Sequence, residues 1–405
     1  MTRGRRILYH HRIRAEDGQA VHVRELIAAL RNAGHEVREC ALVPKASANA
    51  APDRPKPGSA SKPGFWQRLS LPRAAVEVLE IAYNQQGRAM LRAAAAEFRP
   101  DFVYERHALH CRAGLDVARQ LGVPLLLEVN SPMVAEMQHL GRLRFPRRAR
   151  RTERAVLGGA DAVLAVTRVL ADLLVDAGAR PERTHVIGNG AVPERYGETA
   201  RQAAPAVRAR WNLPADAFAL GFVGYMRPWH RLDLVLEAMQ RPGLEPLVLV
   251  LMGRGPALEP LLTSARERGL AARVVALGEV GSELLPAHVL ACDGALIPAI
   301  NDYASPLKLF DSLAAGVPTL APDQPNLRES IRDGDDGLLF RPGEVDDLTR
   351  QLARLVADRG FARELGERGR RRLLTERWTW AGNAERVIEV FDRLAPATPV
   401  GEGAR

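Results

Sequence analysis

Short apolar runs alternate with amphipathic stretches along the whole chain. The runs that predict strands are residues 7–9, 37–43, 102–104, 124–129, 162–166 and 185–187 in the first half, and residues 219–223, 247–252, 274–277, 295–297, 318–321 and 338–340 in the second. Between them, apolar residues recur at helical spacing, as Val23, Ile27 and Leu30 do. Strands that alternate with helices are typical of parallel sheets. The two sets therefore predict an α/β protein with two doubly wound, Rossmann-like domains.

Two stretches lack this alternation. Residues 189–210 lose β character, so we expect a domain boundary there, with a first domain of residues 1–192 and a second of residues 193–380. Residues 44–72 are rich in Pro, Ala, Ser and Lys and cannot bury enough apolar surface to fold alone. Two domains also fit the length, because 405 residues exceed what one core usually organises.

Charge and cysteine content narrow the environment. The formal charge is +9, and arginines cluster in residues 141–154, which is read as a solvated helix face or as a contact with an anionic membrane leaflet or lipid diphosphate. Nucleic acid is less favoured, because no finger, RNA-binding sheet or aromatic-interleaved groove accompanies the charge. No apolar run approaches the ~20 residues that span a bilayer, and the first run is too short for a signal core. Three isolated cysteines predict neither disulfides nor a zinc site, so we expect a reducing cytoplasm.

The most informative segment is SPLKLFDSLAAGVPTLAPD, residues 305–323. Ser305 can cap a helix that starts at Pro306, and Gly316 ends it before a buried strand. Lys308, Asp311 and Ser312 are three and four residues apart and are predicted to share one helical face. A helix N-terminus in an open α/β sheet attracts anions, so the cation and the carboxylate predict a site for a phosphate followed by a ribose.

A second candidate lies in GFVGYMRPWHRLDLVLEAM, residues 221–239. The strand turns at Gly224, and Arg227, His230 and Arg231 follow in the turn, at the carboxyl end where open α/β sheets bind ligands. Three cationic or potentially cationic groups suit a diphosphate. The alternative is surface arginines beside one packed histidine.

Polar residues also follow strand ends in the first half. Gly18 is predicted in the first strand-to-helix loop, where backbone can approach a ligand. The remaining residues of this kind are Glu105, Arg106, His107, Glu128 and Asn130. Each alone suits capping or core polarity as well as catalysis. Hydrolase interpretations lack a nucleophile, because the chain has no Gly-x-Ser-x-Gly elbow, and MGRGP at residues 252–256 is neither a P-loop nor a full dinucleotide pattern.

These segments together resemble glycosyltransferase family 4, the retaining, GT-B-fold, sugar-nucleotide-dependent transferases. The resemblance rests, in chain order, on DGQAVHVRELIAALRNAGHEV, GNGAV, FVGYMRPWHRLDLVLEAM, MGRGP and SPLKLFDSLAAGVPTLA. The WH pair and the SPLK string further resemble a subgroup found in exopolysaccharide and cell-envelope gene products. The resemblance implies two Rossmann-like domains that face each other across a cleft, the second binding the nucleotide sugar. We also expect a helix near residues 380–395 to pack back on the first domain.

The chain departs from the family pattern at five positions. The family often has Glu, seven residues, Glu, where this chain has Tyr303, with Asp302 adjacent, and Asp311. The usual Arg and Lys of the phosphate turn fall on Tyr225 and His230, and a common Gly falls on Arg231.

The resemblance implies roles residue by residue. The catalytic candidates are Arg227, His230, Lys308 and His107, the first three stabilising the departing diphosphate. The donor-binding candidates are Gly18, Gly224, Val280 beside the base, the segment Ser305, Pro306 and Leu307 through its free backbone amides, and Asp311 at the ribose. The acceptor-side candidates are Arg106, Glu128 and Asn130, with His107 beside them. No metal or other cofactor is implied.

The implied function is transfer of a hexose, with retention, from a nucleotide diphosphate to a hydroxyl of a glycan, lipid-linked or small-molecule acceptor. The setting would be envelope or exopolysaccharide assembly, in the cytoplasm, with peripheral membrane contact. Two alternatives stay open: a sugar-nucleotide 2-epimerase, and a non-catalytic GT-B descendant that binds polyanions or membranes.

Overall fold

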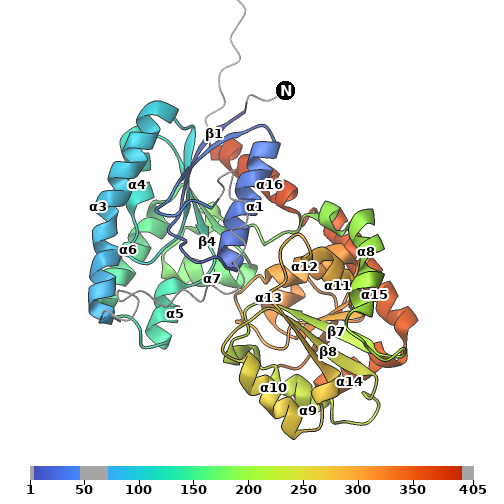
Figure 1. Cartoon of the computed structure of the whole chain (residues 1–405). Coiled ribbons are helices and arrows are strands. Elements are labelled where there is room, and N and C mark those ends of the chain that lie inside the picture. The colour runs from blue at the N-terminus through green and yellow to red at the C-terminus, as the bar shows by residue number, and fades with distance from the viewer. Residues whose placement is uncertain (1–3, 46–71, 395–405) are drawn as a thin grey trace, which may run out of the picture. The chain divides into compact units, whose positions relative to one another are not determined.

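The computed structural model describes residues 4–45 and 72–394, and most of the irregular stretch at residues 44–72 lies outside the described residues. Within it, the chain divides into two compact units (Figure 1). Unit 1 contains residues 1–166, 170–187 and 384–405, and unit 2 contains residues 167–169 and 188–383. Sequence patterning placed the boundary near residue 192. No helix among the described residues combines the length and apolarity needed to cross a bilayer.

Unit 1 is built around a parallel sheet with strand order β2-β1-β3-β4-β5-β6. Its strands are β1 (Arg6–His10), β2 (Glu36–Cys40), β3 (Phe102–Arg106), β4 (Leu125–Val129), β5 (Ala162–Ala165) and β6 (Thr184–Val186). Its helices are α1 (Gly18–Asn32), α3 (Arg73–Phe98), α4 (Ala113–Leu121), α5 (Met133–His139), α6 (Pro146–Gly159), α7 (Arg168–Ala177) and most of α16 (Trp380–Leu394), with a 3₁₀ turn at Pro181–Arg183. β3 and β4 are buried along their whole length, as expected of central strands covered on both faces.

The last helix, α16, belongs mostly to unit 1, although it follows unit 2 in the chain. Phe391 stacks on Phe102 of β3 with ring centroids 4.5 Å apart, and Arg5 donates to Asp392 at 2.7 Å. The helix near residues 380–395 therefore lies against the sheet of the first unit.

Unit 2 repeats the architecture with strand order β12-β11-β10-β7-β8-β9. Its strands are β7 (Phe218–Val223), β8 (Leu247–Met252), β9 (Val274–Gly278), β10 (Gly294–Leu296), β11 (Thr319–Pro322) and β12 (Leu338–Phe340). Its helices are α8 (Glu198–Ala209), α9 (Asp233–Ala238), α10 (Leu258–Glu267), α11 (Leu285–Leu290), α12 (Leu307–Ala315), α13 (Pro325–Arg328), α14 (Val345–Ala357) and α15 (Arg359–Thr375), and its 3₁₀ turns are Pro193–Tyr196, Pro228–His230 and Ala271–Arg273.

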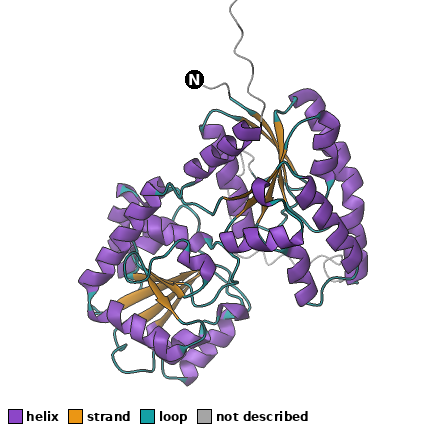
Figure 2. Cartoon of the chain, turned by 180° about the vertical axis from the view of Figure 1, so that it is seen from behind, coloured by secondary structure: helices purple, strands orange, loops and turns teal. Residues whose placement is uncertain are grey.

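All strand pairs in both sheets are parallel, and helices cover both faces of each sheet (Figure 2). The prediction of two doubly wound α/β domains is confirmed, and each of the twelve apolar runs corresponds to a strand. The second run was predicted too long, because β2 ends at Cys40.

The strand order determines where ligands can enter. Chain progression reverses between β1 and β3 in unit 1 and between β7 and β10 in unit 2. The loops that leave the two reversing strands diverge to opposite faces of a doubly wound sheet and leave a crevice at their carboxyl ends. The loops after β1, β3, β7 and β10 are therefore the first places to look for a site.

Candidate functional site

The turn after β7 is held rigidly against the turn after β8. Met226 donates its amide to the Arg254 carbonyl at 2.7 Å. Gly253 and Gly255 have φ of +137° and +151°, and a Cβ on Gly255 would lie 2.2 Å from the Met226 carbonyl oxygen. The two glycines of MGRGP therefore serve close backbone packing, which fixes the position of the segment that carries Arg227.

Lys308 extends from the first turn of α12 to the end of β7. Its Nζ lies 4.0 Å from the centroid of the Phe222 ring, and a Cβ on Gly224 would meet that Nζ at 3.4 Å. Gly224, with φ of +135°, leaves this space open. Burial lowers the pKa of Lys308 from 10.5 to about 7. Without an anion nearby, the amine is therefore only about half charged at neutral pH.

His230 is neutral, and this corrects the prediction of a third cationic group. Its Nδ1 accepts a hydrogen bond of 3.1 Å from the Arg227 amide, which leaves the proton on Nε2. Burial, and then the positive charges of Lys308 and Arg227, lower its pKa to about 3. The imidazole can therefore donate from Nε2 to an anion without carrying charge.

His230 and Lys308 both contact Phe222, and the Arg227 charge lies near enough to His230 to lower its pKa. The His230 ring lies 5.2 Å from the Phe222 ring, whose face Lys308 occupies, and the Arg227 guanidinium lies 5.0 Å from the Tyr225 ring. All three groups stand beside the carboxyl end of β7, where the strand order of unit 2 reverses. Their role in binding a diphosphate stays a prediction.

The start of α12 differs from the prediction. The helix begins at Leu307, Pro306 occupies the N-cap position, and no side chain caps it. The Ser305 hydroxyl instead accepts from the Asn189 amide at 3.1 Å, and the Ser305 carbonyl accepts from the Asn189 side chain at 2.5 Å. First-turn amides have no intrahelical acceptor, so the amides of Leu307 and Lys308 remain suited to an anion.

Lys308, Asp311 and Ser312 share one face of α12, as predicted, but their side chains have different partners. The Asp311 carboxylate accepts from the Tyr196 hydroxyl at 2.8 Å. The Ser312 side chain is buried, and its hydroxyl donates to the Lys308 carbonyl of the same helix at 2.8 Å, so this donor is already used within α12. Tyr196 therefore orients the Asp311 carboxylate, whose role at a ribose stays a prediction.

A cavity of about 270 Å³ opens beside Val280, next to the β9 edge of the unit 2 sheet. The side chains that line it include Trp211, Leu277 and His288, and the Trp211 and His288 rings are 6.2 Å apart. Val280 therefore lies at an open, partly aromatic surface, and its predicted position beside a base is not tested by this geometry.

In unit 1, Gly18 is not in a loop. It is the first residue of α1, its φ is not positive, and Asp17 caps the helix by accepting from the Gln19 amide at 3.0 Å. The predicted reason for a glycine at this position, close approach of the backbone to a ligand, stays a prediction. Gly18 still lies in the segment between β1 and β2, on the side where unit 1 reverses.

Glu128 is the centre of a buried hydrogen-bonded group. Its carboxylate accepts from Arg106, from Asn130 and, at 2.7 Å, from the Tyr104 hydroxyl, and His22 Nε2 lies 3.0 Å from it. Burial by itself would raise the pKa of Glu128, but the charges of His22 and Arg106 outweigh it and hold the pKa well below the usual value. Glu128 therefore orients Arg106 and Asn130 and is not itself open to an acceptor.

His107 is the least satisfied of the acceptor-side candidates. It is buried, and in the part of the chain that the structure describes neither ring nitrogen has a hydrogen-bond partner. The nearest carboxylate oxygen, on Glu153, lies 3.8 Å from Nε2. A buried imidazole without hydrogen-bond partners is costly, and binding of an acceptor hydroxyl by His107 stays a prediction.

Comparison with known proteins agrees with both halves of this architecture. Residues 17–190 match the glycosyl transferase 4-like domain, and residues 204–372 match the glycosyl transferases group 1 family. Among solved structures, sucrose-phosphate synthase from Thermosynechococcus elongatus superposes with a TM-score of 0.72 at 21% identity, over 96% of this chain and 99% of that one. HepE from Anabaena, solved with UDP and glucose, superposes with a TM-score of 0.66 at 16% identity, over 96% and 100%.

The chain belongs to the family 4 glycosyltransferases, with the GT-B fold. A curated relative, the D-inositol 3-phosphate glycosyltransferase of Streptomyces bingchenggensis, is 28% identical over 305 residues. That alignment covers 72% of this chain and 66% of the relative.

The departures of this glycosyltransferase from the family pattern have local explanations. Arg231, where a Gly is common, has φ of +53° and ψ of +42°, a left-handed conformation that Gly adopts without strain. Its guanidinium is half exposed and forms an ion pair with the Asp233 carboxylate, with 3.0 Å between nitrogen and oxygen. Tyr303, where the first acid is usual, is fixed by Asn301, which donates to its hydroxyl at 2.8 Å.

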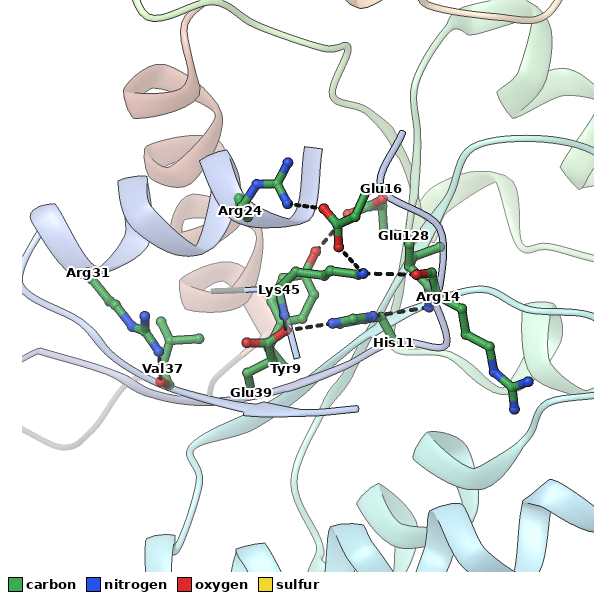
Figure 3. Close-up of polar contacts among 11 residues, drawn as sticks. Tyr9, His11, Arg14, Glu16, Arg24, Arg31, Val37, Glu39, Lys45 and Glu128 are labelled. Carbon is green, nitrogen blue, oxygen red and sulfur yellow. Dashed lines mark hydrogen bonds and ion pairs between the residues drawn. The ribbon is translucent and has the colours of Figure 1, made fainter. Parts of the chain in front are cut away.

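Sequence reasoning missed a second polar cluster in unit 1 (Figure 3). Lys45 is buried; its Nζ donates to the Arg14 carbonyl at 3.0 Å and pairs with Glu16. Glu39 accepts from His11 Nε2 at 2.8 Å and from the Lys45 amide at 2.5 Å. The cluster fastens the segment between β1 and α1. No spacing predicts it, because β1–β2 pairing brings its members together.

Only one group of three potential metal-ligating side chains occurs among the described residues: His10, Glu105 and Cys111, all buried. His10 Nδ1 lies 2.5 Å from Glu105 Oε2, which also accepts from the Gly114 amide at 2.8 Å. Burial, and then the Glu105 charge, raise the pKa of the Cys111 thiol well above its usual range. The group thus behaves as a hydrogen-bonded core element, with the thiol protonated.

Proposed function

We propose that this chain is an active, metal-independent transferase that moves a hexose, with retention, from a nucleotide diphosphate to a hydroxyl acceptor. One observation carries the proposal. Lys308, Arg227 and the Nε2–H of His230 stand together at the switch point of unit 2, beside the amides that open α12. Such a set of fixed donors suits a diphosphate that gains charge as its bond to the sugar breaks.

The chemistry follows from where charge develops. As the bond between the anomeric carbon and the diphosphate oxygen breaks, its electron pair stays on that oxygen, and the nearby donors stabilise it. The acceptor hydroxyl forms its bond to the same carbon on the face that the diphosphate leaves, and its proton passes to the departing oxygen. Asp311, oriented by Tyr196, binds the ribose hydroxyls, and His107 binds the acceptor hydroxyl.

The likeness to HepE solved with UDP and glucose supports a uridine or similar diphosphate donor, and the D-inositol 3-phosphate glycosyltransferase relative supports a small hydroxyl-bearing acceptor. Glycan and lipid-linked acceptors belong to the same proposal, as does a role in envelope or exopolysaccharide assembly in the cytoplasm. Peripheral membrane contact is supported by arginines of residues 142–154 that lie exposed on unit 1.

The decisive test is nucleotide release from a panel of sugar nucleotides, with and without a chelator. We expect one donor to be turned over with equal rates in both conditions. Lys308→Ala should lose ~2–4 kcal/mol of transition-state stabilisation, the size of a lost oxyanion donor, whereas Arg266→Gln on α10 should behave as the parent.

Folded protein that neither binds nor turns over any donor would refute the proposal. Conversion of the donor to its epimer without acceptor would replace the transferase with a 2-epimerase, and loss of activity with chelator would refute metal independence. Retention is read from the anomeric configuration of the product.

A further inference from the structure

The first half of α3 exposes an apolar stripe. Ala74, Val78, Leu79 and Ala82 are all exposed, and the two large side chains, Val78 and Leu79, are 52% and 59% exposed. Helices on a protein surface usually present polar residues at exposed positions. We call these four residues the α3 stripe. Figure 1 shows α3 along the outer edge of unit 1.

Two more large apolar side chains lie beside the same end of α3. Leu140 and Phe145 are 50% and 37% exposed. Their segment is tied to the helix, because Arg73 donates to the Arg142 carbonyl at 2.8 Å and Glu77 accepts from the Phe145 amide at 3.0 Å. Leu140 and Phe145 therefore lie beside the first turns of α3, where the stripe begins.

The chain segment that carries Leu140 and Phe145 is also strongly basic. Seven arginines are exposed on the segment from residue 142 to 154, and we call them the basic segment: Arg142, Arg144, Arg147, Arg148, Arg150, Arg151 and Arg154. Two acidic residues near these arginines, Glu77 and Glu153, are buried. Glu77 is buried against backbone amides, and Glu153, the only acid of the segment, is buried beside Val134, whose amide donates to it at 3.3 Å. Exposed arginines with no exposed acid among them favour an anionic partner.

We propose that the α3 stripe, Leu140, Phe145 and the basic segment together bind an anionic lipid bilayer, with Val78, Leu79 and Phe145 inserted among the lipid chains. Apolar residues flanked by exposed arginines match the charge and depth profile of a bilayer interface. A second copy of the chain is disfavoured, because a self-complementary contact would bring the arginines of both copies together. A nucleic acid would leave the apolar residues unused.

The inference deepens the proposed membrane contact by naming its surface and its inserted residues, and it needs no donor or acceptor chemistry. The full-length chain is floated with vesicles of phosphatidylcholine, with and without phosphatidylglycerol, in the absence of nucleotide. We expect binding to the anionic vesicles only, weakened by salt. Failure here would leave the transferase proposal intact, and failure of the nucleotide test would leave this one intact.

Matched variants separate the two components. Replacing Arg147, Arg148 and Arg151 by Gln should weaken vesicle binding about a hundredfold, at about fivefold for each arginine. The control variant, Arg266→Gln with Arg268→Gln at the end of α10, should bind vesicles as the parent does. Val78→Ser with Leu79→Gln should weaken binding about tenfold or more, whereas Leu374→Gln, which removes a side chain 46% exposed on unit 2, should not.

Insertion can be read directly, because the three native cysteines are buried and a surface cysteine can be labelled alone. An environment-sensitive dye on Leu79→Cys should shift to the blue with anionic vesicles, and the same dye on Leu374→Cys should not. The proposal is overturned if neither label shifts, if both respond alike, or if the control variants bind as weakly as the test variants. A label at position 79 that is shielded before vesicles are added would mean that protein covers the stripe, which also overturns it.

Discussion

We expect Lys308 to couple donor binding to proton uptake. Its pKa of about 7 in the free protein results from burial, and a diphosphate beside Nζ would restore the pKa toward its ordinary value of 10.5. Below pH 7 the amine is already charged, and above it a proton must be taken up with the ligand. For a bound pKa near 10.5, uptake should be about 0.1, 0.5 and 0.9 protons at pH 6, 7 and 8.

Calorimetry in buffers of different ionisation enthalpy measures this uptake. The ligand should be an intact sugar nucleotide, whose diphosphate has no terminal hydroxyl that titrates near pH 7. Between pH 7 and 10.5 the dissociation constant should rise toward tenfold per pH unit. Binding heats that do not depend on the buffer, or uptake that does not increase through pH 7, would refute the reasoning.

His230 could also take up a proton, so it needs its own control. Raising its pKa from about 3 to above 7 would require more than about 5 kcal/mol, which we do not expect. In His230→Asn, the amide oxygen can accept from Arg227 in place of Nδ1, and uptake should persist. In Lys308→Met, uptake should vanish.

The lowered pKa of Lys308 also predicts how the stability of the ligand-free protein depends on pH. The drop from 10.5 to about 7 corresponds to at most ~5 kcal/mol, and because Lys308 is only partly buried we expect ~2–4 kcal/mol. This penalty is fully present below pH 7 and fades as pH rises to 10.5, where the amine is neutral in both states. Lys308→Met should therefore raise the free energy of urea unfolding at pH 6 and have little effect near pH 10. A destabilised variant at pH 6 would contradict the burial argument.

Three further predictions concern other parts of the site. Tyr196→Phe should lower donor affinity by ~1 kcal/mol, because the Asp311 carboxylate loses its 2.8 Å hydrogen bond, and an unchanged titration would remove Tyr196 from the site. Arg231→Gly should raise the free energy of urea unfolding by up to ~1 kcal/mol with donor affinity unchanged, since φ of +53° strains an arginine; a loss of affinity would mean that Arg231 contacts the ligand. Glu128→Gln should destabilise unit 1 by ~3 kcal/mol at pH 7, because Arg106 is left buried and unpaired. Because the folded-state pKa of Glu128 is lowered, its stabilisation is lost only as pH falls well below 4, where the parent and the variant should become equally stable. A difference in stability that persists in acid would contradict the charge argument.

The strands were predictable because burial on both faces of a parallel sheet leaves a continuous apolar run. β8 matches its predicted bounds for this reason. Local turn chemistry was less reliable. Ser305 satisfies every sequence rule for a cap, yet it bonds to Asn189, which lies far away in the chain, because a side-chain hydroxyl takes whichever partner the fold brings closest.

Candidate chemistry was predictable by type and position but not by charge state. Proximity to strand ends was enough to select Arg227, His230 and Lys308. His230 is neutral because of its burial and the nearby charges of Lys308 and Arg227, and Lys308 is half charged because of its burial; spacing along the chain encodes neither. The cluster of Lys45 and Glu39 was not predicted from the sequence for a related reason, because its residues come together only when β1 and β2 pair.

The amino-acid sequence by itself determined the α/β class, the two sheets and the loops in which ligand-binding groups lie, because apolar periodicity and chain order depend on local spacing alone. The tertiary structure decided which side chains meet, how far their pKa values move, and which apolar residues of α3 are left uncovered. Those properties depend on distance and solvent access in three dimensions, and both are fixed only when separate segments pack together.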